Sequence, residues 1–357
     1  MDITDLTRLT PEQLTRDVEQ QRAGFSTEHE EQVRAVIRKV RRDGDRALLS
    51  YTERFDGVRL DAGGLEVPRE EIERAARGFG DDLYEALATA VRRVRDFHRH
   101  AAPPDWEHTD ELGNRLGQRA VPLRRVGVYV PGGTAVYPST LVMTAVPAQA
   151  AGVEEVMVVS PPGSFRPPSA LCAALTLLDR PCRVFRVGGV QGVAALAWGT
   201  ETIPRVDKIV GPGSARVTLA KQLLYGQVDI DMVAGPSEVL VVTDGTVDPR
   251  VTAADLLAQA EHDRDARAIC VTPGPETARE VSRWTDRLAA ESPRREIAEA
   301  SLRAGGRVYL VADLEQAIEV ANLVAPEHLE LQTADPRALL PRVRNAGAIF
   351  LGRHTPE

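Results

Sequence analysis

The sequence predicts an α/β protein built from two modules with parallel-rich sheets. From about residue 120 onward, short apolar runs rich in β-branched residues alternate with helical segments, and many of these runs end in Gly or Pro. This alternation is typical of parallel strands joined by helical crossovers. The length of 357 residues suits two domains, and a hydrophobic content of 43% is enough for both cores.

The part of the chain before about residue 115 is predicted to be helical. The segment TPEQ at 10–13 has the pattern of a capping box with proline at the first helical position. Two amphipathic helices follow, with apolar stripes that include Val33 and Val40 in the first and Leu83 and Val94 in the second. We expect this helical part to pack on the second of the two modules.

The first module is predicted from about residue 125 to residue 213. Its strands are expected at 125–130, 156–159, 183–187 and 207–210, with helices at 139–151, 170–178 and 193–197. Three strand ends are rich in glycine: PGG at 131–133, GG at 188–189 and GPG at 211–213. Ligands bind at the carboxyl ends of parallel strands, but no segment here matches G-x-G-x-x-G. A nucleotide site and simple turn chemistry therefore remain equally open.

The second module is predicted to have strands at 238–242, 267–272, 307–311 and 348–351. A helix between the first two carries Gln259 and His262, and residues three apart on a helix could share a metal ion. No thiolate lies nearby in the sequence, so the donors would be nitrogen and oxygen, which favours zinc first, with manganese or cobalt as substitutes. A hydrogen-bonded glutamine and a structural histidine are the alternative and commoner explanation.

A second candidate pair is Glu327 and His328, adjacent residues after Pro326, which we expect to begin a turn or a short helix. An imidazole accepts a proton near neutral pH, and an adjacent carboxylate can serve a separate proton transfer, such as the activation of water. Neighbours of this kind are common on protein surfaces. The pair alone therefore does not decide between catalysis and an ordinary surface.

The composition narrows the class of protein further. A net charge of −8 disfavours binding to nucleic acid or to an anionic membrane. The first residues lack the basic and apolar regions of a secretory signal, and apolar runs such as 141–151 are too short to span a bilayer. Cys172, Cys182 and Cys270 have no C-x-x-C spacing, so buried reduced thiols are expected. We expect a cytoplasmic protein.

Five motifs, taken together and in order, resemble histidinol dehydrogenase. They are VYVPGG at 128–133, VGPG at 210–213, DMVAGPSE at 231–238, AQAEHD at 258–263 and APEHLEL at 325–331. The resemblance also includes FDG at 55–57 and AGAIFLG at 346–352, so it covers nearly the whole chain. Five ordered motifs are far more specific than either residue pair alone.

The resemblance implies a homodimeric enzyme of two Rossmann-like modules, one inserted in the other, with an N-terminal helical arm. Residues 1–24 are expected to form the arm, which reaches toward the partner subunit. Residues 25–128 and 237–357 are expected to form the domain with the metal and catalytic residues, and residues 129–236 the NAD-side domain.

The implied reaction is the oxidation of L-histidinol through the aldehyde to L-histidine with two NAD, the last two steps of histidine biosynthesis. By the resemblance, His328 is the base that takes the hydroxyl proton and also contacts the substrate, and Glu327 activates water. Gln259 and His262 are the implied ligands of a zinc ion (Zn2+) that holds the substrate. Ser237 is an implied substrate contact.

On the NAD side, the resemblance implies contacts from Tyr129, Gln191 and the residue at position 214. Here that residue is Ser214, where the family usually has Asn, so weaker or rearranged NAD binding is expected. The chain also stops at residue 357, where family members continue into a region with two further zinc ligands, one of them a His from the partner subunit. We therefore expect this chain alone to bind zinc weakly and to turn over little substrate.

Two other functions remain open at this stage. One is a zinc- and NAD-dependent dehydrogenase of another small polar alcohol, because most substrate contacts would lie in the region that the family has beyond residue 357. The other is a non-catalytic paralogue that serves as a binding partner. The presence of Gln259, His262, Glu327 and His328 argues against the second, since unused catalytic residues tend to be lost.

Overall fold

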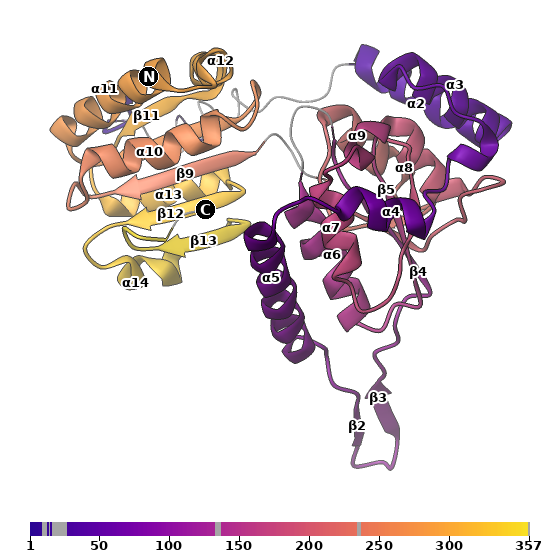
Figure 1. Ribbon diagram of the computed structural model, residues 1–357. Helices are drawn as coiled ribbons and strands as arrows, with labels where there is room; N and C mark the ends of the chain where they lie inside the picture. Colours follow the sequence, from indigo (N-terminus) through magenta and orange to yellow (C-terminus); the bar gives the residue numbers. More distant parts are fainter. Residues whose placement is uncertain (9–12, 14, 16–26, 133–136, 234–236, 356–357) are drawn as a thin grey trace. The chain divides into compact units, whose positions relative to one another are not determined.

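The computed structural model describes residues 1–8, 13, 15, 27–132, 137–233 and 237–355 (Figure 1). The chain forms two compact units. The inserted unit comprises residues 25–234, and the flanking unit comprises residues 1–24 together with residues 235–357. The predicted α/β class, with one module inserted in the other, is thus confirmed. Among the described helices, none combines the length and the apolar character that a membrane crossing requires.

The flanking unit contains a six-stranded sheet in which all neighbouring strands are parallel. The strands lie in the order β1-β11-β10-β9-β12-β13. Their bounds are β1 Asp2–Asp5, β9 Glu238–Thr243, β10 Arg267–Thr272, β11 Arg307–Leu310, β12 His328–Gln332 and β13 Ala348–Leu351.

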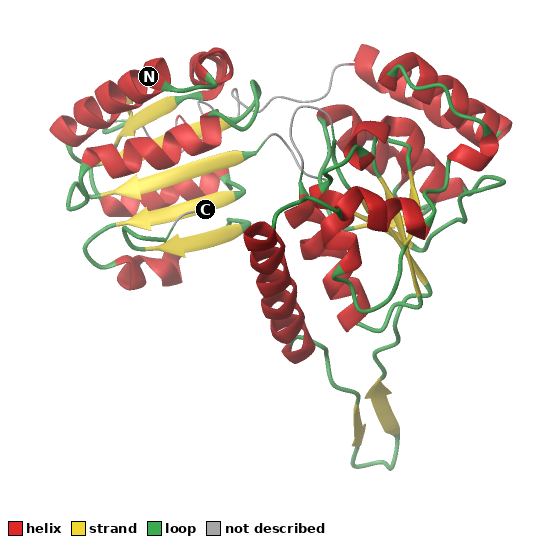
Figure 2. Cartoon of the chain, viewed as in Figure 1, coloured by secondary structure: helices red, strands yellow, loops and turns green. Residues whose placement is uncertain are grey.

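Helices cover both faces of this sheet (Figures 1 and 2). One face packs against α10 Pro249–Ala260, α11 Pro275–Glu291 and α12 Arg295–Gly305, and the other against α13 Leu314–Val324 and α14 Pro336–Leu339. Because side chains alternate along a strand, β9 supplies both cores. Val239 and Val241 belong to the core on the α10 face, and Leu240 and Val242 to the core on the α13 face.

The first strand, β1, completes an edge of this sheet beside β11. Leu6 directly after it is fully buried, and the Ser282 hydroxyl of α11 donates to the Met1 carbonyl over 2.8 Å. Residues 2–5 were expected in a helical arm, and this part of the prediction was wrong, because backbone pairing with β11 does not require an apolar strand. The predicted helix start at residues 10–12 and most of the arm lie outside the described residues.

The inserted unit is built around a five-stranded parallel sheet in the order β6-β5-β4-β7-β8. The strands are β4 Arg125–Tyr129, β5 Glu155–Val159, β6 Arg183–Phe185, β7 Lys208–Val210 and β8 Asp229–Ile230. One face packs against α4 Arg69–Ala76, α5 Asp81–His100, α6 Pro138–Ala150 and α7 Ala170–Thr176. The other packs against α2 Thr27–Asp43, α3 Asp45–Asp56, α8 Gly189–Trp198 and α9 Ala215–Leu224.

The helices of residues 27–100 therefore belong to the inserted unit. We expected residues 25–128 to form a domain with residues 237–357, and the structure corrects this. The apolar stripe of α2 packs on α8 and α9, and that of α5 packs on α6. An amphipathic stripe shows that a helix is packed, but not against which sheet, so the sequence did not reveal the partner.

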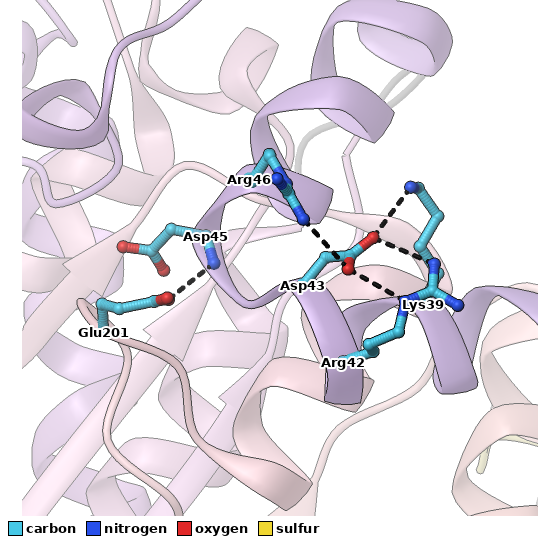
Figure 3. Close-up of polar contacts among 6 residues, drawn as sticks. All are labelled: Lys39, Arg42, Asp43, Asp45, Arg46 and Glu201. Carbon is cyan, nitrogen blue, oxygen red and sulfur yellow. Dashed lines mark hydrogen bonds and ion pairs between the residues drawn. The ribbon is translucent and has the colours of Figure 1, made fainter.

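The corner between α2 and α3 is fixed by charged groups (Figure 3). The Asp43 carboxylate accepts hydrogen bonds from Lys39, Arg42 and Arg46, and these hold its pKa well below the usual range. After the turn, the backbone amide of Asp45 donates to Glu201 over 2.8 Å, from the loop after α8. This hydrogen bond joins the helices α2 and α3 to the loop after α8 in the same unit.

An exposed hairpin between α5 and β4 is, like β1, a feature that the helical prediction for this part of the chain missed. Strands β2 Trp106–Thr109 and β3 Arg115–Gln118 pair antiparallel, and every residue of both is exposed. The Asp110 carboxylate accepts hydrogen bonds from the backbone amides of Leu112 and Asn114 and so closes the turn. The hairpin lies outside both cores of the unit.

The three cysteines are free thiols, as predicted. Cys172 and Cys270 are buried and Cys182 is partly buried. Burial raises the pKa of the Cys270 thiol to about 12, and that of Cys182 also to about 12. A thiol that does not ionise is a poor nucleophile, so none of these residues is a candidate for covalent catalysis.

Candidate active site

Helix α10 positions Gln259 and leads directly to His262. The helix begins at Pro249, where the Asp248 side chain caps it by accepting from the amide of Arg250. It ends at Ala260, so Gln259 lies in its last turn and is 2% exposed. His262 is exposed and lies in the turn after the helix, with its amide donating to the Gln259 carbonyl over 3.1 Å. The two residues were expected on one helix face, but only Gln259 is helical.

Glu261, between these two residues, faces a different neighbour. Its carboxylate accepts a hydrogen bond from the hydroxyl of Ser292, just beyond α11. It therefore does not join Gln259 and His262 as a third donor. Within the described ranges of the chain, no group of three or more His, Cys, Asp or Glu side chains is placed to hold a metal ion.

Glu327 directly precedes β12 and His328 begins it, where a turn or a short helix was expected. Helix α13 ends at Val324, and Ala325 takes a left-handed conformation with φ 52°. Pro326 thus follows a helix end and leads into an extended segment, which corrects the prediction. Both candidate side chains are half-buried, and the His328 ring meets Phe350 of β13 edge-on, with 5.7 Å between ring centres.

The candidates of the flanking unit share one edge of its sheet. Ser237 directly precedes β9, and His328 begins β12 and pairs with Val239 of β9. Helix α10 connects the parallel neighbours β9 and β10, so it runs back along the sheet, and its last turn lies at the amino-terminal ends of the strands. Gln259 therefore lies at the same edge as His328. Ligands of α/β sheets usually bind at the opposite, carboxyl edge.

The candidate NAD residues lie at the carboxyl edge of the sheet in the inserted unit. Tyr129 ends β4, is buried, and accepts a hydrogen bond at its hydroxyl from the amide of Gly189 over 3.0 Å. Burial raises the pKa of Tyr129. Gln191 is buried in the first turn of α8, while Ser214 is exposed and precedes α9, with no hydrogen bond from its side chain to the helix.

An ion pair between a buried lysine and a more exposed aspartate supports the loop GPG at 211–213, and the sequence analysis missed it. The Lys221 ammonium of α9 donates to the Gly211 carbonyl over 2.9 Å and pairs with Asp231. The Asp231 carboxylate in turn accepts from the amide of Gly211 over 2.8 Å. The signal in the sequence was a lysine within the largely apolar helix α9, and its burial became visible only in the structure.

A second missed feature is a buried polar network between α10 and β12. The side-chain amide of Gln332 donates to Asp255 over 2.6 Å and to Glu330 over 2.7 Å. Its carbonyl accepts from the Thr252 hydroxyl over 2.6 Å. His328, Glu330 and Gln332 alternate along β12, but the proline before them favours a turn or a short helix and so hides this strand pattern in the sequence.

The family model described as Histidinol dehydrogenase matches residues 19–357. The histidinol dehydrogenase of Aquifex aeolicus (strain VF5) is 50% identical over 331 residues, which are 92% of this chain and 76% of that protein. The histidinol dehydrogenase of Methylococcus capsulatus is 48% identical over 334 residues, which are 93% of this chain and 76% of that protein.

A solved structure agrees with these relatives. The crystal structure of histidinol dehydrogenase from Elizabethkingia anophelis superposes with a TM-score of 0.91 at 32% sequence identity. The superposition covers 100% of this chain and 81% of that chain. The fold similarity thus extends over both units of the chain.

Proposed function

This chain belongs to the histidinol dehydrogenase family of NAD-dependent oxidoreductases, and from this premise we propose how its residues oxidise L-histidinol through the aldehyde to L-histidine. One observation supports the choice of residues. Ser237, Gln259, His262, Glu327 and His328 all lie at the amino-terminal edge of one sheet, although they come from three separate segments of the chain.

His328 acts as the general base. Its imidazole accepts the hydroxyl proton of the alcohol while the hydride leaves, because an imidazole is basic enough to do so near neutral pH. NAD, when bound, accepts the hydride in each of the two oxidations. Glu327 takes a proton from the water that adds to the aldehyde, which gives the hydrate needed for the second oxidation. The half-burial of both side chains leaves them accessible to a substrate.

Gln259 and His262 are the proposed zinc ligands in the part of the site that binds the substrate. An amide oxygen and an imidazole nitrogen are both donors that zinc accepts, and together they supply two of the usual four ligands. A zinc ion bound there would orient the imidazole and the amino nitrogen of L-histidinol. The burial of Gln259 limits its side chain to few orientations, and the Ser237 hydroxyl adds a polar contact at the same edge.

Tyr129, Gln191 and Ser214 contact NAD in the inserted unit. The exposed Ser214 hydroxyl makes no hydrogen bond to α9, so it can reach a ligand, but it is shorter than the Asn that the family usually has. We expect Ser214→Asn to lower the Michaelis constant for NAD by several-fold, consistent with one gained hydrogen bond. An unchanged constant in steady-state kinetics would refute this role for position 214.

The enzyme is proposed to be a cytoplasmic homodimer that binds neither nucleic acid nor membrane. The family and the net charge of −8 support this. Sedimentation velocity of the purified protein should give twice the mass of one chain. A single-chain mass at micromolar concentration would contradict the dimer.

The assay that tests the proposed mechanism is NADH formation from L-histidinol with added zinc. His328→Gln should lower kcat by about 10²- to 10⁴-fold, which is the usual contribution of a general base. Glu327→Gln should slow the second oxidation more than the first, so that fewer than two NADH form per histidinol in the early phase. Another small polar alcohol as the better substrate would overturn the assignment of L-histidinol.

The matched control is His108→Gln on the exposed strand β2, which removes an imidazole outside the proposed site. It should leave kcat unchanged. Equal activity of His328→Gln and His108→Gln would contradict the role of His328, and no activity with any alcohol would favour a non-catalytic protein.

A further inference from the structure

Two polar stripes face each other between α10 and β12. Thr252, Asp255 and Gln259 are spaced by three and four residues, so they lie along one side of α10. Gln332 and Glu330, with His328 beyond them, lie on one face of β12, as the regular pairing of β12 with β9 and β13 requires. The residues of β9 and β10 that lie beneath α10 are, by contrast, largely apolar.

The hydrogen bonds of Gln332 define how these stripes are aligned. Its amide is bonded at once to Thr252 and Asp255 on the helix and to Glu330 on the strand. From Thr252 to Gln259 the helix rises by about 10 Å, and from Gln332 to His328 the strand spans about 13 Å in the same direction. The alignment therefore brings Gln259 to nearly the same level as His328.

Because this network is buried, its hydrogen bonds depend strongly on the position of α10 along the sheet. Gln332 and Glu330 are each 1% exposed. Apolar contacts tolerate sliding of a helix on a sheet, whereas a hydrogen bond weakens steeply when its distance or angle changes. Burying amide and carboxylate groups without hydrogen bonds is unfavourable, and the three bonds of Gln332 are made in this register of α10, which is therefore preferred over its neighbours.

We propose that Gln332 is a positioning residue: its side-chain amide fixes the register of α10 on β12 and thereby sets Gln259 and His262 against Glu327 and His328. The inference rests on the proposed function of these four residues. Gln332 itself lies at the opposite end of β12 from His328, so it acts on the site only through the two elements that it joins.

The test compares four variants of the full chain. Gln332→Met keeps the length of the side chain and removes all three hydrogen bonds. Thr252→Val removes one of them, and Thr252→Ser keeps it. Ser301→Ala is the matched control, because it deletes a buried hydrogen bond to the Ala266 carbonyl in the same unit but outside the network.

Three quantities are measured on each variant: zinc affinity of the metal-depleted protein titrated with zinc, kcat with L-histidinol, and hydrogen exchange of the amides at 257–262. Gln332→Met should lower zinc affinity and kcat by about 10- to 100-fold, the range seen when a group that orients a metal ligand is lost, with the KM for NAD unchanged. It should also speed exchange at 257–262. Thr252→Val should give a smaller effect of the same kind, while Thr252→Ser and Ser301→Ala stay near wild type.

The outcomes separate the two proposals. Wild-type zinc affinity and exchange in Gln332→Met, or equal losses in Ser301→Ala at an equal fall in melting temperature, would overturn the positioning role. If the unaltered chain oxidises another small polar alcohol better than L-histidinol, the proposed function fails, and hydrogen exchange at 257–262 still decides whether Gln332 fixes α10. If Gln332→Met does not fold, the pair Thr252→Val and Thr252→Ser decides the same question.

Discussion

At the scale of single residues, Gly211 shows how closely the candidate NAD loop is built. Its φ of 114° lies in a region that side-chain-bearing residues rarely adopt, and a Cβ there would lie 2.2 Å from the Tyr129 carbonyl oxygen. The same residue is bonded at its amide and its carbonyl to the pair of Asp231 and Lys221. The backbone at this position therefore cannot shift to make room for a side chain.

Gly211→Ala should lower the free energy of unfolding by about 3 kcal/mol or more, because it combines backbone strain with a clash against main-chain atoms. The matched control is Gly226→Ala. Gly226 has a φ of 93° but no atom within 4 Å of its Cβ position, so only the strain of about 1–2 kcal/mol should appear. Urea denaturation measures the free energy of unfolding of both variants. An equal decrease in the two would show that the clash with Tyr129 adds nothing to the backbone strain.

The buried thiol of Cys270 should make stability depend on alkaline pH. Its pKa of about 12 in the folded protein exceeds that of an unfolded cysteine, near 8.5. Between about pH 8.5 and 12 the folded state holds a proton that the unfolded state has lost. The free energy of unfolding is therefore unaffected by this thiol below about pH 8.5 and declines as pH rises toward 12. In Cys270→Ala the free energy of unfolding should fall less steeply with rising pH, by up to about 1.4 kcal/mol per pH unit.

Measurements of unfolding free energy between pH 9 and 10.5 test this expectation. Val308→Ala is a suitable control, since Val308 is buried in the same core and carries no ionisable group. It should lower stability without changing the slope against pH. Identical slopes for the unaltered chain and Cys270→Ala would contradict the link to this thiol.

The residues of the candidate site could be predicted from the sequence only where a local pattern points to them. Gln259 with His262 and Glu327 with His328 were found by spacing and adjacency, and the family resemblance gave them roles. Glu330 and Gln332 could not be found in this way. Acidic and amide side chains are usually exposed, and nothing nearby in the sequence shows that these two are covered by α10.

At the scale of elements, most helices and strands of the two modules were predictable, because apolar runs and helical periodicity mark them. The misses have physical causes. Strand β1 is short and polar, and its place is decided by pairing with β11 some 300 residues later. Strand β12 alternates polar and apolar residues after a proline, and this proline suggested a turn. In both cases the strand forms because of its pairing with distant parts of the chain, and the neighbouring residues do not predict it.

Strand β1 should contribute substantially to the stability of the flanking unit. Leu6 at its end is fully buried, so Leu6→Ala should cost about 2–5 kcal/mol through lost contacts and the cavity that remains. Ile3 on the same segment is 43% exposed, and Ile3→Ala should cost less than about 1 kcal/mol. Chemical denaturation distinguishes the two, and a small effect for Leu6→Ala would mean that the segment detaches readily.

At the scale of the whole molecule, each unit has its own cores. Two apolar clusters lie within residues 25–234, one on each face of the five-stranded sheet, and two others lie within the flanking unit. A domain with its own core can in principle fold alone. The inserted unit is also continuous in sequence, which the flanking unit is not.

A fragment of residues 25–234 should therefore fold by itself. We expect a helix-rich circular dichroism spectrum and a single cooperative urea transition, as small single domains show. The same fragment with Leu196→Asp, which places a carboxylate in a fully buried position, serves as an unfolded reference. A broad transition in both fragments would mean that the inserted unit depends on the rest of the chain.

The pairing of β1 with β11 also affects how the protein is made. A ribosome releases residues 2–5 well before their partner strand at 307–310, which emerges only after some 300 further residues. At about 5–20 residues per second, the nascent first strand waits roughly 15–60 seconds with its hydrogen-bonding groups unpaired. During that interval residues 25–234 can emerge and fold completely. Biosynthesis would thus complete residues 25–234 before strand β1, and residues 2–5, although translated earlier, would be among the last to reach their final structure.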